Sequence, residues 1–209
     1  MTNPRTYAGL TLWPEQDEAV TKACKMLAHD PRVVTLMPCG SGKTVTGGAI
    51  AQELVDPHTG SVLITVPTLQ LVAQTLTQWL WAFGPDALGE VVALCSDPHV
   101  LDQYNRGTSG IQARILSDAR ELAALKATGR RITAVCTYQS LHEVIAAHRA
   151  GADAWGLVII DELHRADGNT RSSRSACLMR HDAGHDSSAG PGKRWCSRSL
   201  GDQHVSKAA

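Results

Sequence analysis

Five short β-branched runs alternate along the chain with segments of helical periodicity, and this alternation restricts the fold more than any other feature. Each run is apolar almost throughout, which is typical of strands buried on both faces of a parallel sheet. The runs are VVTLM (33–37), SVLITV (61–66), VVALC (91–95), ITAVC (132–136) and GLVII (156–160). Strands that alternate with helices predict an α/β domain in which a parallel sheet carries helices on both faces.

The segments between these runs repeat their apolar residues at helical spacing. Ser117 has the side chain of an N-cap and is expected to start one of the helices. The stretch 96–110 is rich in turn residues and is expected to form a surface loop. The predicted helices cover residues 14–28, 43–55, 69–83, 117–127 and 139–149.

Composition describes an ordinary globular protein. The 209 residues include 20 Lys and Arg against 20 Asp and Glu, so any contact with nucleic acid must be local rather than driven by net charge. No apolar run reaches the ~18 residues of a membrane span, and the N-terminus has no signal-peptide core. The six cysteines are scattered and are expected to be reduced thiols. We therefore expect a cytoplasmic protein with no membrane partner.

The stretch VVTLMPCGSGKTV is the sharpest motif. A strand leads into a glycine-rich turn, and Lys43 and Thr44 begin a helix, so backbone N–H groups can converge on a phosphate at the helix N-terminus. In this pattern Lys43 reaches the β- and γ-phosphates of a nucleoside triphosphate, and Thr44 ligates Mg²⁺. The motif predicts a P-loop, although Met37 stands where a glycine is usual. The competing interpretation is a glycine-rich turn with a chance Gly-Lys-Thr.

The second motif, LVIIDELH, ends a buried strand with two carboxylates. Ligands of open α/β sheets bind at the carboxyl ends of the strands. There Asp161 can hold Mg²⁺, directly or through water, and Glu162 can orient and deprotonate an attacking water. The competing interpretation is that Asp161 only caps a helix that follows the strand.

Together, MPCGSGKT and DELH resemble motifs I and II of superfamily 2 helicases of the DEAD/DEAH (DExH) type, with restriction-type bacterial relatives as the nearest likeness. The resemblance implies a RecA-like domain that binds ATP and Mg²⁺, with Lys43 and Glu162 in catalysis. LTLWPEQ resembles the Q-motif, in which Gln16 would read adenine, although Trp13 replaces the usual arginine and Glu15 the usual aromatic residue. The implied nucleotide-binding residues are Gln16, Pro38, Cys39, Gly40, Ser41, Gly42, Lys43 and Thr44, with Thr44 and Asp161 as metal ligands.

Two further stretches resemble the motifs that line the nucleic-acid track in this family. VPTLQLVAQ (66–74) resembles motif Ia, and TYQSL (137–141) resembles motif Ic. Taken alone, they could be no more than strand-to-helix turns with N-caps. The resemblance implies a nucleic-acid partner, with DNA preferred to RNA, and a second RecA-like domain that another chain could supply. The implied contacts are Pro67, Thr68, Gln74, Thr137 and Tyr138.

After residue 165 the apolar pattern stops. Ser, Arg, Gly, Asp and His dominate residues 166–209, and such a composition cannot bury enough surface to offset the entropy of ordering. We therefore divide the chain into an N-terminal extension (1–9), an ATP-binding RecA-like domain (10–165) and a disordered or aberrant tail (166–209), such as a frameshift or a truncated gene would produce. In the family another strand lies between those of motifs I and II. We expect a gap there and a fold that is incomplete on its C-terminal side.

Three functions follow from these residues. The first is an ATP-dependent helicase or translocase, represented by its N-terminal ATP-binding domain. The second is an inactive truncated fragment or pseudoenzyme that binds nucleotide or nucleic acid only with a partner chain. The third, another P-loop enzyme such as a kinase, is disfavoured by the DELH carboxylates and by the likeness to motif Ia.

Overall fold

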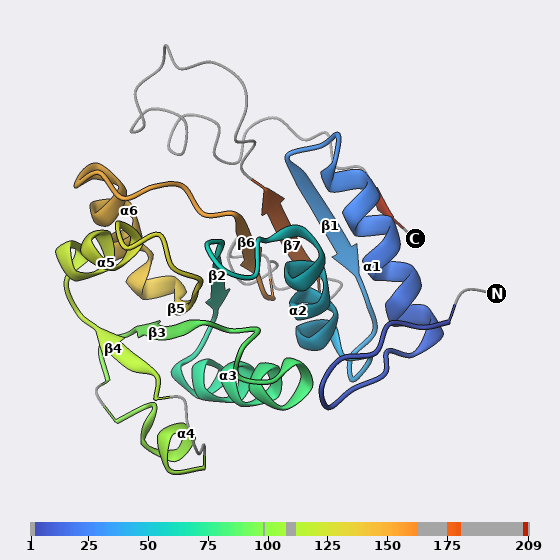
Figure 1. Cartoon of the computed structure of the whole chain (residues 1–209), viewed down its shortest axis with the longest axis horizontal. Coiled ribbons are helices and arrows are strands. Elements are labelled where there is room, and N and C mark those ends of the chain that lie inside the picture. Colours follow the sequence, from blue (N-terminus) through green and yellow to red (C-terminus); the bar gives the residue numbers. More distant parts are fainter. Residues whose placement is uncertain (1–2, 98, 108–111, 163–174, 181–206, 209) are drawn as a thin grey trace.

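The computed structural model describes residues 3–97, 99–107, 112–162, 175–180 and 207–208, which form one sheet flanked by helices (Figure 1). The strands lie in the order β4-β3-β5-β2-β6-β7-β1-β8. They are β1 (Arg32–Leu36), β2 (Ser61–Val66), β3 (Glu90–Leu94), β4 (Arg114–Leu116), β5 (Ile132–Thr137), β6 (Leu157–Ile160), β7 (Ser175–Arg180) and β8 (Lys207–Ala208). The helices are α1 (Pro14–Leu27), α2 (Lys43–Leu54), α3 (Leu69–Phe83), α4 (Asp102–Gly107), α5 (Ala119–Lys126), the 3₁₀ turn η1 (Tyr138–Ser140) and α6 (Leu141–Arg149).

Five neighbouring strands, from β4 through β3, β5 and β2 to β6, run parallel to one another. The predicted parallel α/β sheet is therefore confirmed. Its register pairs Val66 with Thr137 across β2 and β5, and Thr65 with Ile160 across β2 and β6. The carboxyl ends of these three strands therefore lie side by side, so the segments that follow them share one edge of the sheet.

β7 lies between β6 and β1 and runs antiparallel to both. Its Cys177 pairs with Val34 on one side and with Ile160 on the other. The prediction of a gap at this place is wrong, because β7 pairs there with both neighbours. An antiparallel strand needs no crossover helix of the kind that joins parallel strands, so β7 does not continue the alternation of strands and helices. Apart from β7 and β8, the predicted tail lies outside the described residues, and the division of the chain at residue 165 stays a prediction.

Side chains that alternate along the central strands divide between two cores. Val62 and Ile64 pack with residues of α1, α2 and α3, whereas Leu63 packs on the opposite face with residues of α5 and α6. Figure 1 shows these two groups of helices on opposite sides of the sheet. Helices on both faces are thus confirmed. In the part of the chain that the structure describes, no helix is long and apolar enough to cross a bilayer.

Two local features differ from the sequence predictions. Helix α4 lies within the stretch expected to be a loop, and the three-residue edge strand β4 follows it. Helix α5 is capped by Asp118 rather than by Ser117, since the Asp118 carboxylate accepts the backbone N–H of Arg120 at 2.7 Å. An ionised acceptor at a helix N-terminus also interacts favourably with the helix dipole, which explains the preference.

Helix α2 approaches α3 closely at one of two adjacent glycines. A Cβ built on Gly48 would lie 2.3 Å from Cε2 of Phe83 and 2.9 Å from Cε2 of Trp79. The rings of Trp79 and Phe83 are themselves in edge-to-face contact, with 6.0 Å between their centroids. A Cβ on the neighbouring Gly47 would meet only Ile159, at an ordinary 3.6 Å.

We expect Gly48→Ala to lower the free energy of unfolding by about 1–3 kcal/mol, because overpacking outweighs the gain in helix propensity. Gly47→Ala is the matched control, and it should be neutral or stabilising by up to about 1 kcal/mol. Urea unfolding of the two variants and the parent chain measures both effects. Equal stability of the two variants would contradict the packing described here.

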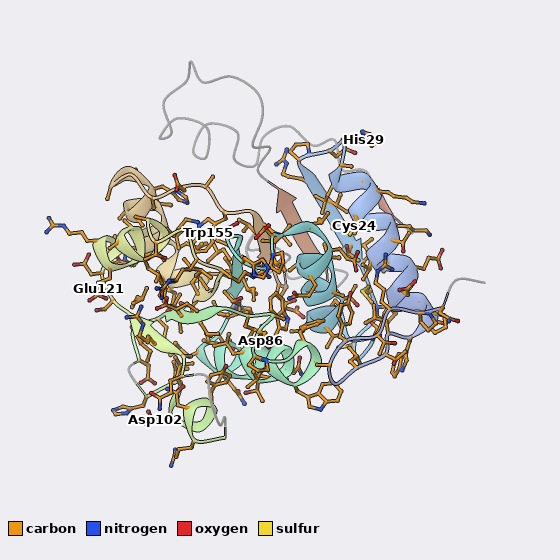
Figure 2. The ribbon with its side chains drawn as sticks, in the orientation of Figure 1. Cys24, His29, Asp86, Asp102, Glu121 and Trp155 are labelled. Atoms are coloured by element: carbon orange, nitrogen blue, oxygen red, sulfur yellow. The ribbon has the colours of Figure 1, made fainter. Side chains whose placement is uncertain are left out.

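Lys126 is buried under the amino-terminal edge of the sheet. Its Nζ donates to Oγ of Ser61 at 2.8 Å and to the carbonyl of Ala154 at 3.2 Å, and lies 3.9 Å from the ring centroid of Trp155. Trp155 lies in the interior on the side of α5 and α6 (Figure 2). Burial lowers the pKa of Lys126 from 10.5 to about 8, and nearby Asp153 opposes this shift.

The lowered pKa of Lys126 predicts a dependence of stability on pH. The unfolded chain holds this proton up to higher pH than the folded chain does, so the contribution of Lys126 raises the free energy of unfolding between about pH 8 and 10.5. Below that window both states are protonated, and the contribution stays level at its lowest value. Lys126→Met should remove this contribution to the slope of the free energy of unfolding against pH. Urea unfolding between about pH 7.5 and 9 measures the slope, and this range stays below the ordinary pKa of tyrosine, so tyrosine ionisation does not contribute. Identical slopes in the parent and the variant would contradict the assignment.

Candidate functional site

The loop between β1 and α2 is a compact turn built on two glycines. Gly40 and Gly42 have φ of 77° and 81°, a region that side chains disfavour and glycine enters freely. Ser41 Oγ donates to the carbonyl of Pro38 at 2.7 Å and tightens the turn. Gly42 is the N-cap of α2, so the first N–H groups of that helix are available at the loop. This is the strand–turn–helix arrangement that the motif predicted.

The loop is open to solvent on its outer side. Pro38, Cys39 and Gly40 are exposed, and a Cβ at Gly40 would meet nothing within 4 Å. The ammonium of Lys43 donates to the carbonyl of Pro38 at 3.3 Å, across the loop from the helix. The arrangement therefore leaves room for an anion in front of the helix N-terminus, with Lys43 beside it.

Gln16 is buried and holds the loop from the side of α1. Its Nε2 donates to the carbonyl of Ser41 at 2.9 Å, and its Oε1 accepts the backbone N–H of Trp13 at 3.0 Å. A Cβ at Gly42 would lie 2.4 Å from that Nε2, so the close approach requires glycine. Sequence reasoning assigned Gln16 to adenine and missed this bracing role. A glutamine three residues after the N-cap of a helix is a sequence signal for the hydrogen bond with the Trp13 N–H, but nothing in the sequence signals the one to Ser41.

Asp161 and Glu162 follow β6 at the carboxyl edge of the sheet, as predicted. The backbone N–H of Asp161 donates to the carbonyl of Thr65 at 3.0 Å, which ties the turn to β2. The N–H of Glu162 donates to Oδ1 of Asp161 at 2.9 Å. Glu162 has φ of 53° and is the only residue other than glycine with positive φ among those the structure describes. Such backbone strain is concentrated at functional sites.

A small pocket brings the two motifs together between α2, α3 and the ends of β2 and β6. Trp79 of α3 lines this pocket and donates its indole N–H to the carbonyl of Thr44 at 2.8 Å. Sequence reasoning did not identify this contact, because the position of Trp79 in the sequence does not reveal that carbonyl. The lining residues are Lys43, Thr44, Ile64, Thr75, Trp79, Ile159 and Asp161.

Four of the five predicted nucleic-acid contacts lie where β2 and β5 end, at the same edge of the sheet, and the fifth, Gln74, lies within α3. Thr68 and Gln74 are exposed, Thr68 as the N-cap of α3, while Pro67 is half-buried. Thr137 is buried, and its hydroxyl shares a hydrogen bond with that of Ser140 at 3.1 Å. The hydroxyl of Tyr138 donates to the carbonyl of Asp161. The side chain of Thr137 is therefore occupied within the protein, and Tyr138 links its turn to the carboxylates.

Residues 9–181 match the family model for the res subunit of type III restriction enzymes. The chain belongs to this family. Its resemblance to superfamily 2 helicases with restriction-type relatives is thereby confirmed, and the chain is a helicase-type domain. No curated protein matches the chain in sequence.

Two solved structures share the fold of the chain. A nuclease-deletion mutant of the type ISP restriction-modification enzyme LlaGI, in complex with a DNA substrate mimic, has a TM-score of 0.64 at 24% identity, covering 78% of this chain. The ATP-dependent type ISP enzyme LlaBIII, bound to DNA, has a TM-score of 0.60 at 21% identity, covering 80%. The matched part is 16% of the LlaGI chain and 11% of the LlaBIII chain, so the chain spans a small part of either.

We expect Gln16→Ala to lower the free energy of unfolding by about 1–2 kcal/mol, since it removes an N-terminal cap acceptor and the donor to Ser41. Gln70→Ala, at an exposed position of α3, is the matched control and should stay within about 0.5 kcal/mol of the parent. Thermal and urea unfolding compare them. A Gln16 variant as stable as the Gln70 variant would contradict the bracing role.

Proposed function

We propose that this chain binds ATP and Mg²⁺ and serves as the ATP-binding domain of a helicase or translocase that acts on nucleic acid. The observation that carries the proposal is the pocket in which Lys43 and Thr44 of α2 meet Asp161 of motif II. A cation-bearing loop at a helix N-terminus and a carboxylate at the end of another strand form the combination that a magnesium-bound triphosphate needs.

The residues of the loop between β1 and α2 and of the turn after β6 fit these groups. The glycines of the loop let backbone N–H groups face the phosphates, and Lys43 exchanges its carbonyl partner for phosphate oxygens. Thr44 and Asp161 would hold the metal, which when bound neutralises charge that develops on the phosphates. Glu162 would orient and deprotonate the attacking water. The amide of Gln16 keeps one donor and one acceptor position beyond its two protein contacts, and these would serve adenine.

The pocket lining contains no arginine among the residues that the structure describes. An arginine that stabilises transition-state charge contributes about 10³–10⁵ in rate in GTPases, where its role is measured. We therefore assign the arginine to a second RecA-like domain, in the same assembly or on another chain, and expect hydrolysis by this chain alone to be slow. The same observation favours the second candidate function, a nucleotide-binding module that is inactive without its partner.

DNA is the nucleic acid that we propose for this domain. The exposed N-terminus of α3, with Thr68, and the adjacent η1 turn offer backbone donors at one edge of the sheet. Such donors bind phosphates without reading bases. LlaGI is in complex with a DNA substrate mimic and LlaBIII is bound to DNA, which supports the same class of partner here.

We expect Lys43→Ala to weaken binding of a fluorescent Mg-nucleotide at least about tenfold, because a hydrogen bond to a charged group is worth about 1.5–3 kcal/mol. Lys22→Ala is the control, since Lys22 lies on α1 in an exposed pair with Glu18. Fluorescence anisotropy gives the affinities, and thermal unfolding verifies that both variants are folded. If Lys43→Ala binds as tightly as the parent, the pocket is not the nucleotide site.

A further inference from the structure

The peptide unit between Asp161 and Glu162 has both of its polar groups engaged within the protein. Its carbonyl accepts the hydroxyl of Tyr138, which reaches over the end of β2 from the neighbouring strand β5. Its N–H donates to Oδ1 of Asp161 at 2.9 Å. The orientation of this single peptide therefore determines whether the Glu162 N–H is hydrogen-bonded to Oδ1 of Asp161.

The orientation is strained. Glu162 has φ of 53°, and a residue with a Cβ is disfavoured there because the Cβ approaches the following carbonyl oxygen. Rotating the peptide would return Glu162 to negative φ, withdraw its N–H from Oδ1 of Asp161 and break the hydrogen bond from Tyr138. Backbone strain of this kind persists only when surrounding contacts stabilise the strained conformation. The hydrogen bond from the Tyr138 hydroxyl to the carbonyl of Asp161 is such a contact.

We propose that Tyr138 is a positioning residue that holds this peptide in a resting orientation, in which the Glu162 N–H occupies Oδ1 of Asp161 and competes with Mg²⁺ for that oxygen. A metal ligand must present free lone pairs, and magnesium demands near-ideal octahedral geometry. The Glu162 N–H takes one lone pair of Oδ1 and draws electron density from the carboxylate, which weakens its attraction for the cation. Metal binding at this oxygen therefore favours turning the peptide away, and the Tyr138 hydrogen bond opposes that turn. The inference rests on the proposed function only for the identity of the metal site.

The first test needs no ligand. Hydrogen exchange of the segment that contains Asp161 and Glu162 is measured in the parent, in Tyr138→Phe and in the control Tyr7→Phe. The Tyr7 hydroxyl donates to Glu53 rather than to Asp161 or Glu162. Tyr138→Phe should exchange this segment several-fold faster, while Tyr7→Phe matches the parent there. Equal exchange in the parent and in Tyr138→Phe would overturn the proposal.

The second test titrates Mg²⁺ against binding of a fluorescent nucleotide. Tyr138→Phe should lower the Mg²⁺ concentration at half-maximal effect several-fold and leave the affinity for nucleotide in EDTA unchanged. A loss of both affinities would show a merely structural role and overturn the proposal. Absence of nucleotide binding by the parent chain would instead overturn the proposed function, and the exchange experiment would still decide the role of Tyr138.

A pair of variants at Glu162 tests the strain directly. Glu162→Ala and Glu162→Gly both lack the carboxylate, but only glycine adopts φ of 53° without cost. Glycine should therefore favour the resting orientation, so Glu162→Gly should require roughly three- to tenfold more Mg²⁺ than Glu162→Ala. Equal requirements, or the reverse order, would contradict the competition at Asp161.

Discussion

The register of three parallel strands, β5, β2 and β6, is the constraint on which the rest of the site depends. Val66 is level with Thr137, and Thr65 with Ile160, so the three strands end within one residue of one another. The turns that follow them therefore lie side by side at one edge of the sheet. A shift of one residue in any of them would turn its buried side chains towards the opposite core. The two separate cores on the faces of the sheet therefore fix the register, and the register in turn places Tyr138 within reach of Asp161.

The loop between β1 and α2 is held from two sides by neutral side chains. Gln16 of α1 bonds the carbonyl of Ser41, and Trp79 of α3 bonds the carbonyl of Thr44. Both donors are buried, so their hydrogen bonds are shielded from competition with water. Neither donor adds charge, and the positive character of the loop is left to Lys43 and to the N-terminus of α2. A site arranged in this way is ordered before any anion arrives, which reduces the entropy lost on binding.

The sequence predicted those parts of the structure that arise from local pattern. The buried strands, the glycine turn before Lys43 and the carboxylates after β6 each carry a signal within a few residues. Contacts between distant residues carry none, which is why the hydrogen bonds of Trp79 and Tyr138 were missed. β7 escaped prediction for a different reason. An antiparallel strand needs no crossover helix, so β7 does not continue the alternation of strands and helices on which the prediction was based.

The position of β1 has a consequence for the order in which the domain folds. Among the described residues β1 pairs only with β7 and β8, which come from the last part of the chain, while β2 to β6 pair with one another. Pairing across so long a loop costs more entropy and forms more slowly than local pairing. β1 is thus synthesised early and joins the sheet late. Until β7 arrives, its unpaired edge is exposed, which makes β1 the segment of a nascent chain most open to misassociation.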